Sequence, residues 1–198
     1  MDQNKFLMVL YGAGFAAAIV IPLLLLWRSR KKRREKFGGL AAALGGEAVT
    51  GMMTDDYVRL NTAAGEAKLK LIPGDDKEPP YLELQVAAPI GFAFAIRKEN
   101  TASRALERWG LMKEVKIGDS LFDEQYLIWG DDQTRIFSFL QDPGRREAVD
   151  YFFRNGFREL YTSPEAVVAR KFKYREEDLE PSLLRSHLEQ LGRFAGKK

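Results

Sequence analysis

The sequence predicts an α+β protein, in which an N-terminal transmembrane helix precedes one domain with an antiparallel sheet packed by C-terminal helices. Two observations lead to this fold class. The chain opens with an uncharged apolar segment, residues 6–27. Apolar residues then recur at every second position over residues 47–96, as in strands, whereas much of the last third of the chain has the spacing of amphipathic helices.

The apolar segment 6–27 predicts a membrane-spanning helix, since a helix of that length extends about 33 Å. A cleaved signal peptide needs basic residues before its apolar segment and small residues after it, and this chain has the reverse order. We therefore expect the helix to be retained. Gly12 and Ala16 form a small-x-x-x-small pair of the kind that lets two such helices pack as a homodimer.

A basic cluster follows the apolar segment at once. It consists of Arg28, Arg30, Lys31, Lys32, Arg33, Arg34 and Lys36. Only Lys5 precedes the span, so the positive-inside rule makes residues 1–5 a short extracytoplasmic tail. Residues 28–36 are then a juxtamembrane segment that contacts anionic lipid headgroups, and residues 37–198 form one cytoplasmic domain.

Charge and cysteine content exclude several functional classes. Residues 1–36 hold 8 of the 31 basic and 2 of the 28 acidic residues, which leaves a net charge of −3 on residues 37–198. The basic character of the chain is therefore a property of its membrane-proximal segment and disfavours a nucleic-acid partner. The absence of cysteine excludes disulfides, thiolate zinc sites and cysteine nucleophiles.

The first half of the domain is predicted to be a sheet. The predicted strands are "MTDDYVRL" (53–60), "AKLKLIP" (67–73), "YLELQVA" (81–87) and "FAFAI" (92–96). The connections between them are too short for helical crossovers, so we expect an antiparallel meander. Before the strands, "FGGLAAALGG" (37–46) predicts a short helix with Phe37, Leu40, Ala41 and Leu44 on one face. This face could lie on the bilayer or dock on the domain, and we favour docking because so short an apolar face binds a membrane weakly.

The second half mixes helices and strands. The predicted elements are a helix at 101–109, a central strand at 125–130, helices at 133–141 and 143–155, a hairpin at 157–174 and a helix at 179–194. Asp132 and Asp142 are predicted to cap the two middle helices. The predicted buried faces are Ile136, Phe137 and Leu140, then Ala148, Val149, Phe152 and Phe153, and finally Leu179, Leu183, Leu191 and Phe194.

The segment "KIGDSLFDEQYLIWGDD" (116–132) is rich in carboxylates, but it lacks the alternating ligands of a calcium loop. We interpret Asp119 as the cap of one helical turn whose Phe122 enters the core, and Asp123 as an acceptor for backbone amides. The rival interpretation is a membrane-bound enzyme in which Asp119, Asp123 and Asp132 converge. Residue spacing leaves that rival open.

No residue pattern demands a metal or a cofactor, so we expect none and favour a non-enzymatic protein. The one histidine, His187, lies on the apolar face of the last helix, where we expect a hydrogen-bonded core histidine. A further alternative is a module for anionic lipid or nucleic acid that uses Arg170, Lys171 and Lys173, which alternate with aromatic residues.

The stretches "LGGEAVTG", "YLELQVAAP" and "VKIGDSLFDEQYLIWGDD" resemble an uncharacterised family of bacterial membrane proteins. In that family one or two transmembrane helices precede a cytoplasmic domain with a G-D-x-x-F-D-x-x-aromatic signature. The matching residues here are Gly118, Asp119, Phe122, Asp123 and Tyr126. The resemblance implies an inner-membrane location and a domain of unknown function, and it carries over no catalytic residue.

Together these patterns predict a single-pass protein of the inner membrane with its N-terminus outside. Its cytoplasmic domain is expected to be a non-catalytic binding or scaffold module for a membrane-protein partner.

Overall fold

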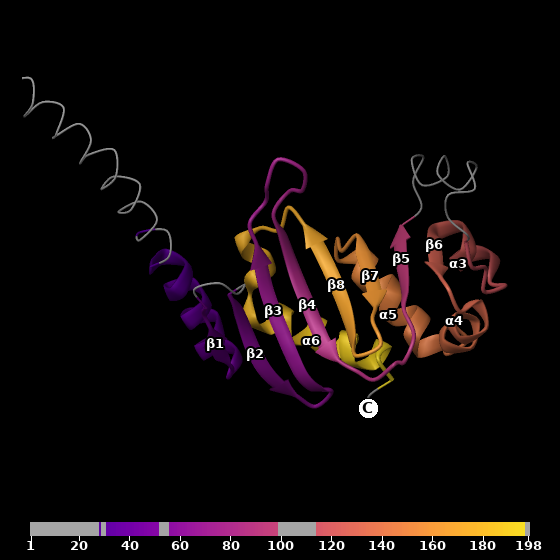
Figure 1. Ribbon diagram of the computed structural model, residues 1–198, viewed down its shortest axis with the longest axis horizontal. Helices are drawn as coiled ribbons and strands as arrows, with labels where there is room; N and C mark the ends of the chain where they lie inside the picture. Colours follow the sequence, from indigo (N-terminus) through magenta and orange to yellow (C-terminus); the bar gives the residue numbers. More distant parts are fainter. Residues whose placement is uncertain (1–27, 29–30, 52–55, 99–113, 197–198) are drawn as a thin grey trace, which may run out of the picture.

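The computed structural model describes residue 28 and residues 31–51, 56–98 and 114–196. In this part of the chain an eight-stranded antiparallel sheet, in the order β1-β2-β3-β4-β8-β7-β5-β6, carries helices on one face (Figure 1). The strands are β1 (Glu47–Val49), β2 (Tyr57–Thr62), β3 (Gly65–Ile72), β4 (Tyr81–Ala87), β5 (Phe94–Lys98), β6 (Tyr126–Gly130), β7 (Glu159–Thr162) and β8 (Ala166–Phe172). The helices are α3 (Ser120–Gln125), α4 (Gln133–Leu140), α5 (Pro143–Arg154), the 3₁₀ turn η1 (Glu176–Leu179) and α6 (Pro181–Phe194), preceded by a helix over residues 31–44.

The predicted α+β class with an antiparallel sheet and packed helices is confirmed. The meander is confirmed for β1 to β4, which pair in sequence order. It is wrong for the next strand, because β4 pairs with β8, and β5 lies between β7 and β6. The expected hairpin around Pro164 is the β7–β8 pair. This late hairpin therefore joins the two halves of the sheet.

Alternation along the strands separates two faces. On one face Leu82, Leu84 and Val86 of β4 have no exposed surface, and α6 packs against β4 and β8. Apolar burial of this kind contributes about 25 cal/mol for each Å² removed from water. In Figure 1, α5 and α6 lie behind the strands. The opposite face of the sheet carries no helix among the described residues, and we call it the helix-free face.

The helix over residues 31–44 docks on the domain, as predicted for its apolar face. Phe37 is 1% exposed and Ala41 is 4% exposed, and both belong to the hydrophobic core together with Leu44. The helix begins within the basic cluster and continues through the glycine pair. None of the helices in the described part of the chain is long and apolar enough to cross a membrane. The span predicted for residues 6–27 lies outside the described residues.

The two middle helices start where predicted. Asp132 accepts a hydrogen bond from the Arg135 backbone amide, and Asp142 accepts one from the Gly144 amide. The predicted buried face of α5 is confirmed in full. That of α4 is wrong at Phe137, which is 44% exposed. Phe139 is buried in its place, because its ring packs between those of Phe94 and Phe194.

The predictions for α6 and β6 need two corrections. In α6, Leu183 is only half-buried, whereas its neighbour Leu184 is fully buried, since the buried stripe is offset by one residue. β6 was expected to be a central strand because both of its faces are apolar, but it is the last strand in the sheet order. On the outer side of β6, Glu114 forms a single antiparallel bridge with Trp129. The helix predicted at 101–109 lies outside the described residues.

Candidate functional site

The carboxylates of the acidic segment bind backbone amides. Asp119 caps α3 by accepting a hydrogen bond from the Phe122 amide at 3.2 Å. The two carboxylate oxygens of Asp123 accept hydrogen bonds from the amides of Ile117 and Gly118, each at 3.0 Å. Asp132 caps α4, as described above. The capping interpretation of these residues agrees with the geometry, and in the part of the chain that the structure describes no group of acidic or histidine side chains is placed to hold a metal ion.

The residues that resemble the family signature form one local unit. Gly118 has a positive φ of 79°, which allows the chain to turn into α3. Phe122 is buried and its ring lies 4.7 Å from that of Tyr126. The Tyr126 hydroxyl donates to Asp150 of α5 at 2.7 Å, and burial followed by this contact raises the pKa of Tyr126. The unit fixes β6 to α3 and α5, so its residues have structural roles.

His187 is fully buried on α6, as expected. Its Nδ1 lies 2.9 Å from the Tyr151 hydroxyl, whereas no partner is found for its Nε2. Burial, helped by the positive charge of Lys171, lowers the pKa of His187 to about 4. The ring packs edge-on against Phe157. In five cavities of the described part of the chain His187 is not among the lining residues, so none of these five offers its ring a substrate position.

The three basic residues at the end of β8 do not form one patch. Arg170 lies on the helix-free face, whereas Lys171 lies on the helix side and donates to Asp178 at 2.6 Å and to the Asn155 carbonyl at 2.7 Å. Burial opposes the charge of Asp178, but the hydrogen bond from Lys171 lowers its pKa overall. Lys173 is exposed beyond the strand. Two of the three cations are therefore committed to internal contacts.

A row of alternating charges crosses the helix-free face. Directly opposed residues on five neighbouring strands are Lys70, Glu83, Arg170, Glu159 and Arg97. Lys70 Nζ lies 3.5 Å from Glu83, and Arg170 reaches Glu83 at 2.9 Å and Glu159 at 3.4 Å. Arg97 pairs with the other oxygen of Glu159. We call this row the charge ladder.

In the charge ladder the carboxylate side chains are more buried than the cationic side chains. The side chains of Glu83 and Glu159 are each 8% exposed, whereas that of Arg97 is 54% exposed. The guanidinium of Arg170 lies between two aromatic rings, 5.1 Å from the Tyr81 centroid and 4.8 Å from that of Tyr161. Burial, and next the charge of Glu83, raises the pKa of Tyr161 to about 12. Buried carboxylates paired in this way fix the positions of the cations above them.

The same face has a hollow beside the ladder, with a volume of about 510 Å³. Its lining includes Ala95 of β5, Trp129 of β6 and Tyr161 of β7. Ala95 lies directly opposite both Trp129 and Tyr161 in the strand register, so its small side chain leaves space between these two residues. The Arg97 guanidinium lies 5.2 Å from the Trp129 ring. A partner side chain that enters this hollow meets an aromatic surface and guanidinium donors together.

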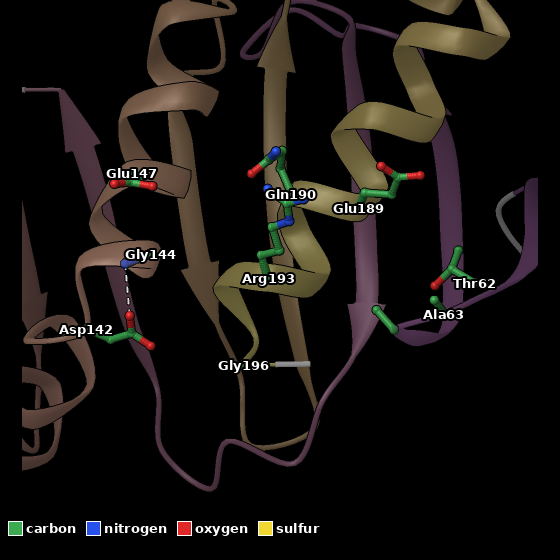
Figure 2. Close-up of a pocket in the computed structure, with 10 residues that line it drawn as sticks. Thr62, Ala63, Asp142, Gly144, Glu147, Glu189, Gln190, Arg193 and Gly196 are labelled. Atoms are coloured by element: carbon green, nitrogen blue, oxygen red, sulfur yellow. Dashed lines mark hydrogen bonds between the residues drawn. The ribbon is translucent and has the colours of Figure 1, made fainter. Parts of the chain in front are cut away.

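A second cavity, of about 570 Å³, lies between α5, α6 and the turn between β2 and β3 (Figure 2). Figure 2 shows Glu147 on α5 and Glu189 on α6 on opposite sides of it. Asp142, a third carboxylate in the lining, already accepts the Gly144 amide as the cap of α5. These carboxylates do not converge on one point, and we assign no chemistry to this cavity.

The charge ladder was not identified in the sequence. The alternation in "YLELQVA" does place Glu83 and Gln85 on the face opposite the leucines. No local pattern shows that Glu83 lies opposite Arg170, however, because β4 and β8 are far apart in the chain. Glu159 is a charged residue in a strand of the predicted hairpin, and its position indicated a need for charge partners. Which residues are its partners depends on the strand order.

Of the basic cluster, Arg28 is exposed, and the residues from Lys31 to Lys36 lie on the helix over residues 31–44. Lys31, Lys32 and Arg34 are exposed. Arg33 lies 3.9 Å from Asp56, and Lys36 lies 2.6 Å from Glu176, so these two connect the helix to the sheet and to η1. Arg30 and the proposed helix contact at Gly12 and Ala16 lie outside the described residues.

No protein-family model and no curated protein sequence matches the chain. Among solved structures, the crystal structure of the mycobacterial trehalose monomycolate transport factor A, TtfA, is similar with a TM-score of 0.48 and 9% sequence identity. The alignment covers 82% of this chain and 92% of that chain. At this level of similarity the function of that protein is not transferred, and function has to be inferred from the geometry of this chain.

Proposed function

We propose that this protein is a non-catalytic binding module, held at the cytoplasmic face of a bacterial inner membrane by a single N-terminal span over residues 6–27. The apolar segment and the basic cluster after it support the anchor and its orientation. The similarity to the uncharacterised membrane-protein family agrees with the same location. A tether of this kind raises the effective concentration of the domain for partners in the membrane.

The observation that carries the proposal is the helix-free face. Eight strands present one side to solvent, and this side displays guanidinium groups and aromatic rings held in place by buried carboxylates. Surfaces that combine arginine with tyrosine and tryptophan are enriched in protein interfaces. We propose this face, and in particular the hollow at Trp129 and Tyr161, as the surface that contacts a membrane-protein partner.

The rival function, an enzyme with convergent carboxylates, has less support. Asp119, Asp123 and Asp132 each accept hydrogen bonds from backbone amides. A catalytic pair needs its carboxyl groups directed to a shared substrate position, with environments that separate their pKa values. The cavity beside α3 includes Asp119 but neither of the other two.

The binding role is tested by affinity purification of the full chain from detergent-solubilised membranes, followed by mass spectrometry. The test variant is Trp129→Ala, which removes an aromatic ring from the lining of the hollow on the helix-free face. The control is Phe137→Ala, which removes an exposed aromatic ring from α4. We expect a partner retained by the wild type and the control but lost from the test variant. Equal recovery with both variants would contradict binding through this face.

The anchor is tested separately. We expect the protein in the membrane fraction, with the domain protected when protease is added to intact spheroplasts and digested after lysis. Digestion of the domain in intact spheroplasts, or recovery of the protein in the soluble fraction, would overturn the proposed location.

A further inference from the structure

The strand register and the cavity lining place a notch between the ends of β5 and β8, at the edge of the sheet that is uppermost in Figure 1. β7 lies between these strands but begins only at Glu159, opposite Arg97 and Arg170. β5 continues to Lys98 and β8 continues to Phe172. Gly156, whose φ is 82°, lies in the turn that connects the end of α5 to the start of β7. The resulting cavity has a volume of about 580 Å³.

Cations and phenyl rings line this notch together. Arg97, Lys98 and Arg158 contribute positive charge, and Glu78 is the one carboxylate in the described lining. Arg97 is already paired with Glu159, whereas Lys98 and Arg158 are exposed and have no acidic partner within the described residues. The apolar lining comes from Phe153, Phe157 and Phe172. Such a site suits an anionic group that is joined to an apolar body.

The notch lies at the same edge of the sheet as the basic start of the helix over residues 31–44. Lys36 contacts Glu176, which follows the end of β8, and Arg33 contacts Asp56, which precedes the start of β2. Because neighbouring strands alternate in direction, the end of β8 and the start of β2 belong to one edge. Between β1 and β7 there are five strand spacings, or roughly 25 Å at about 4.8 Å each.

Because the helix over residues 31–44 is packed on the domain, the basic cluster and the sheet have a fixed orientation relative to each other. Phe37 is buried in the core, and Arg185 of α6 donates to the Ala43 carbonyl at 2.7 Å. The upper edge is not uniformly cationic, however. The turn between β3 and β4 carries Asp75, Asp76 and Glu78. Attraction to an anionic surface is therefore concentrated at two places, the start of the helix and the notch.

We propose that the upper edge faces the bilayer and that the notch binds the headgroup of an anionic phospholipid. Lys98 and Arg158 contact the phosphate, and Phe172 contacts the apolar region below the headgroup. This inference rests on the proposed membrane anchor, since the anchor brings the edge and the lipid together. A bilayer lipid is favoured over an acidic protein because the basic helix start lies at the same edge as the notch.

The test uses the full chain in nanodiscs of phosphatidylcholine, alone or mixed in equal parts with phosphatidylglycerol. Because the chain contains no cysteine, a single fluorophore can be attached at Asp76→Cys on the upper edge or at Ala63→Cys in the turn between β2 and β3 at the opposite edge. Lipids with a nitroxide headgroup quench a fluorophore close to the bilayer. We expect strong quenching at position 76 in the mixed discs and little at position 63.

The variant Lys98→Gln/Arg158→Gln should lower the ratio of docked to undocked domain about 25-fold, at roughly fivefold for each cation. Arg135→Gln/Arg193→Gln removes the same charge elsewhere and should leave the ratio unchanged, as should the charge-conserving Lys98→Arg/Arg158→Lys. Circular dichroism of each variant checks that the fold is intact.

Equal quenching at positions 76 and 63, or equal quenching with and without phosphatidylglycerol, would overturn the proposal. If position 76 is not quenched in the mixed discs, calorimetric titration with millimolar glycerol phosphate or with an acidic peptide identifies the occupant. Binding of either one that Lys98→Gln/Arg158→Gln abolishes would assign the notch to a free anion or to a protein partner and would exclude the lipid. A chain that is not retained in the discs at all would instead contradict the proposed anchor, so the two failures are distinguishable.

Discussion

Arg170 and Lys171 are neighbours in β8, yet they stabilise opposite sides of the sheet. Arg170 joins two buried carboxylates on the helix-free face and lies between two tyrosine rings. Lys171 points to the helix side, where it holds Asp178 of η1 close to His187 of α6. Both cations pair with carboxylates that are nearly buried, so we expect burial of the partner, rather than the presence of a cation, to determine what a basic residue contributes. Four predictions test the two sides of the sheet, from the largest expected effect to the smallest.

Replacing Arg170 by alanine removes the central cation of the charge ladder. Glu83 and Glu159 are then left nearly buried, with Lys70 and Arg97 as their cationic partners among the described residues. We expect the free energy of unfolding to fall by about 4 kcal/mol, the usual cost of breaking a buried pair. Urea unfolding of the detergent-solubilised chain, followed by circular dichroism, measures the loss. A loss near zero would mean that the carboxylates are hydrated.

The helix side responds to pH through His187. Its pKa is lowered to about 4 in the folded state, from about 6.5 in an unfolded chain. The stabilisation by the neutral ring is therefore complete above pH 6.5 and is lost as the pH falls toward 4, by up to about 3 kcal/mol. The free energy of unfolding, measured across this pH range, should change more steeply with pH for the wild type than for His187→Leu. Parallel slopes would contradict a buried neutral ring.

Asp123 tests a carboxylate that contacts amides instead of cations. Asp123→Ala leaves the amides of Ile117 and Gly118 without their acceptor. We expect a loss of about 2 kcal/mol in the free energy of unfolding, mostly from the amide of the buried residue Ile117, since the hydrogen bond at Gly118 is exposed. Glu124→Ala is the matched control, because Glu124 is exposed in the same helix. If both variants lose the same stability, the capping role of Asp123 is wrong.

Arg59 is the exposed counterpart of Arg170. It lies on the same face and contacts Glu47 at 2.6 Å, but the side chains are 45% and 67% exposed. Water and salt screen such a pair, so Arg59→Ala should leave the thermal unfolding midpoint unchanged. A clear decrease in the midpoint would show that an exposed pair of opposite charges also stabilises the fold. Burial would then not be what distinguishes Arg170 from Arg59.

Much of the sheet and of the C-terminal helices could be predicted because their signals are local. The leucines of β3 and β4 alternate, and the helix caps Asp132 and Asp142 precede regular apolar spacing. The errors at Phe137 and Leu183 have a different cause. Each has an equally apolar neighbour in its helix, and the choice between them depends on which side of the helix meets the core. That choice is made by packing and not by residue type.

The sequence by itself determined the class of the fold, the capping carboxylates at 119–132, the burial of His187 and the apolar face through which the helix over residues 31–44 docks. Each follows from spacing within one helix or strand. Tertiary structure alone decided that β8 lies beside β4, that β6 is the last strand, and that five charged residues form the ladder. It also decided that Lys98 and Arg158 share a notch. These depend on pairing between distant segments, because the backbone hydrogen bonds of a sheet carry no side-chain identity.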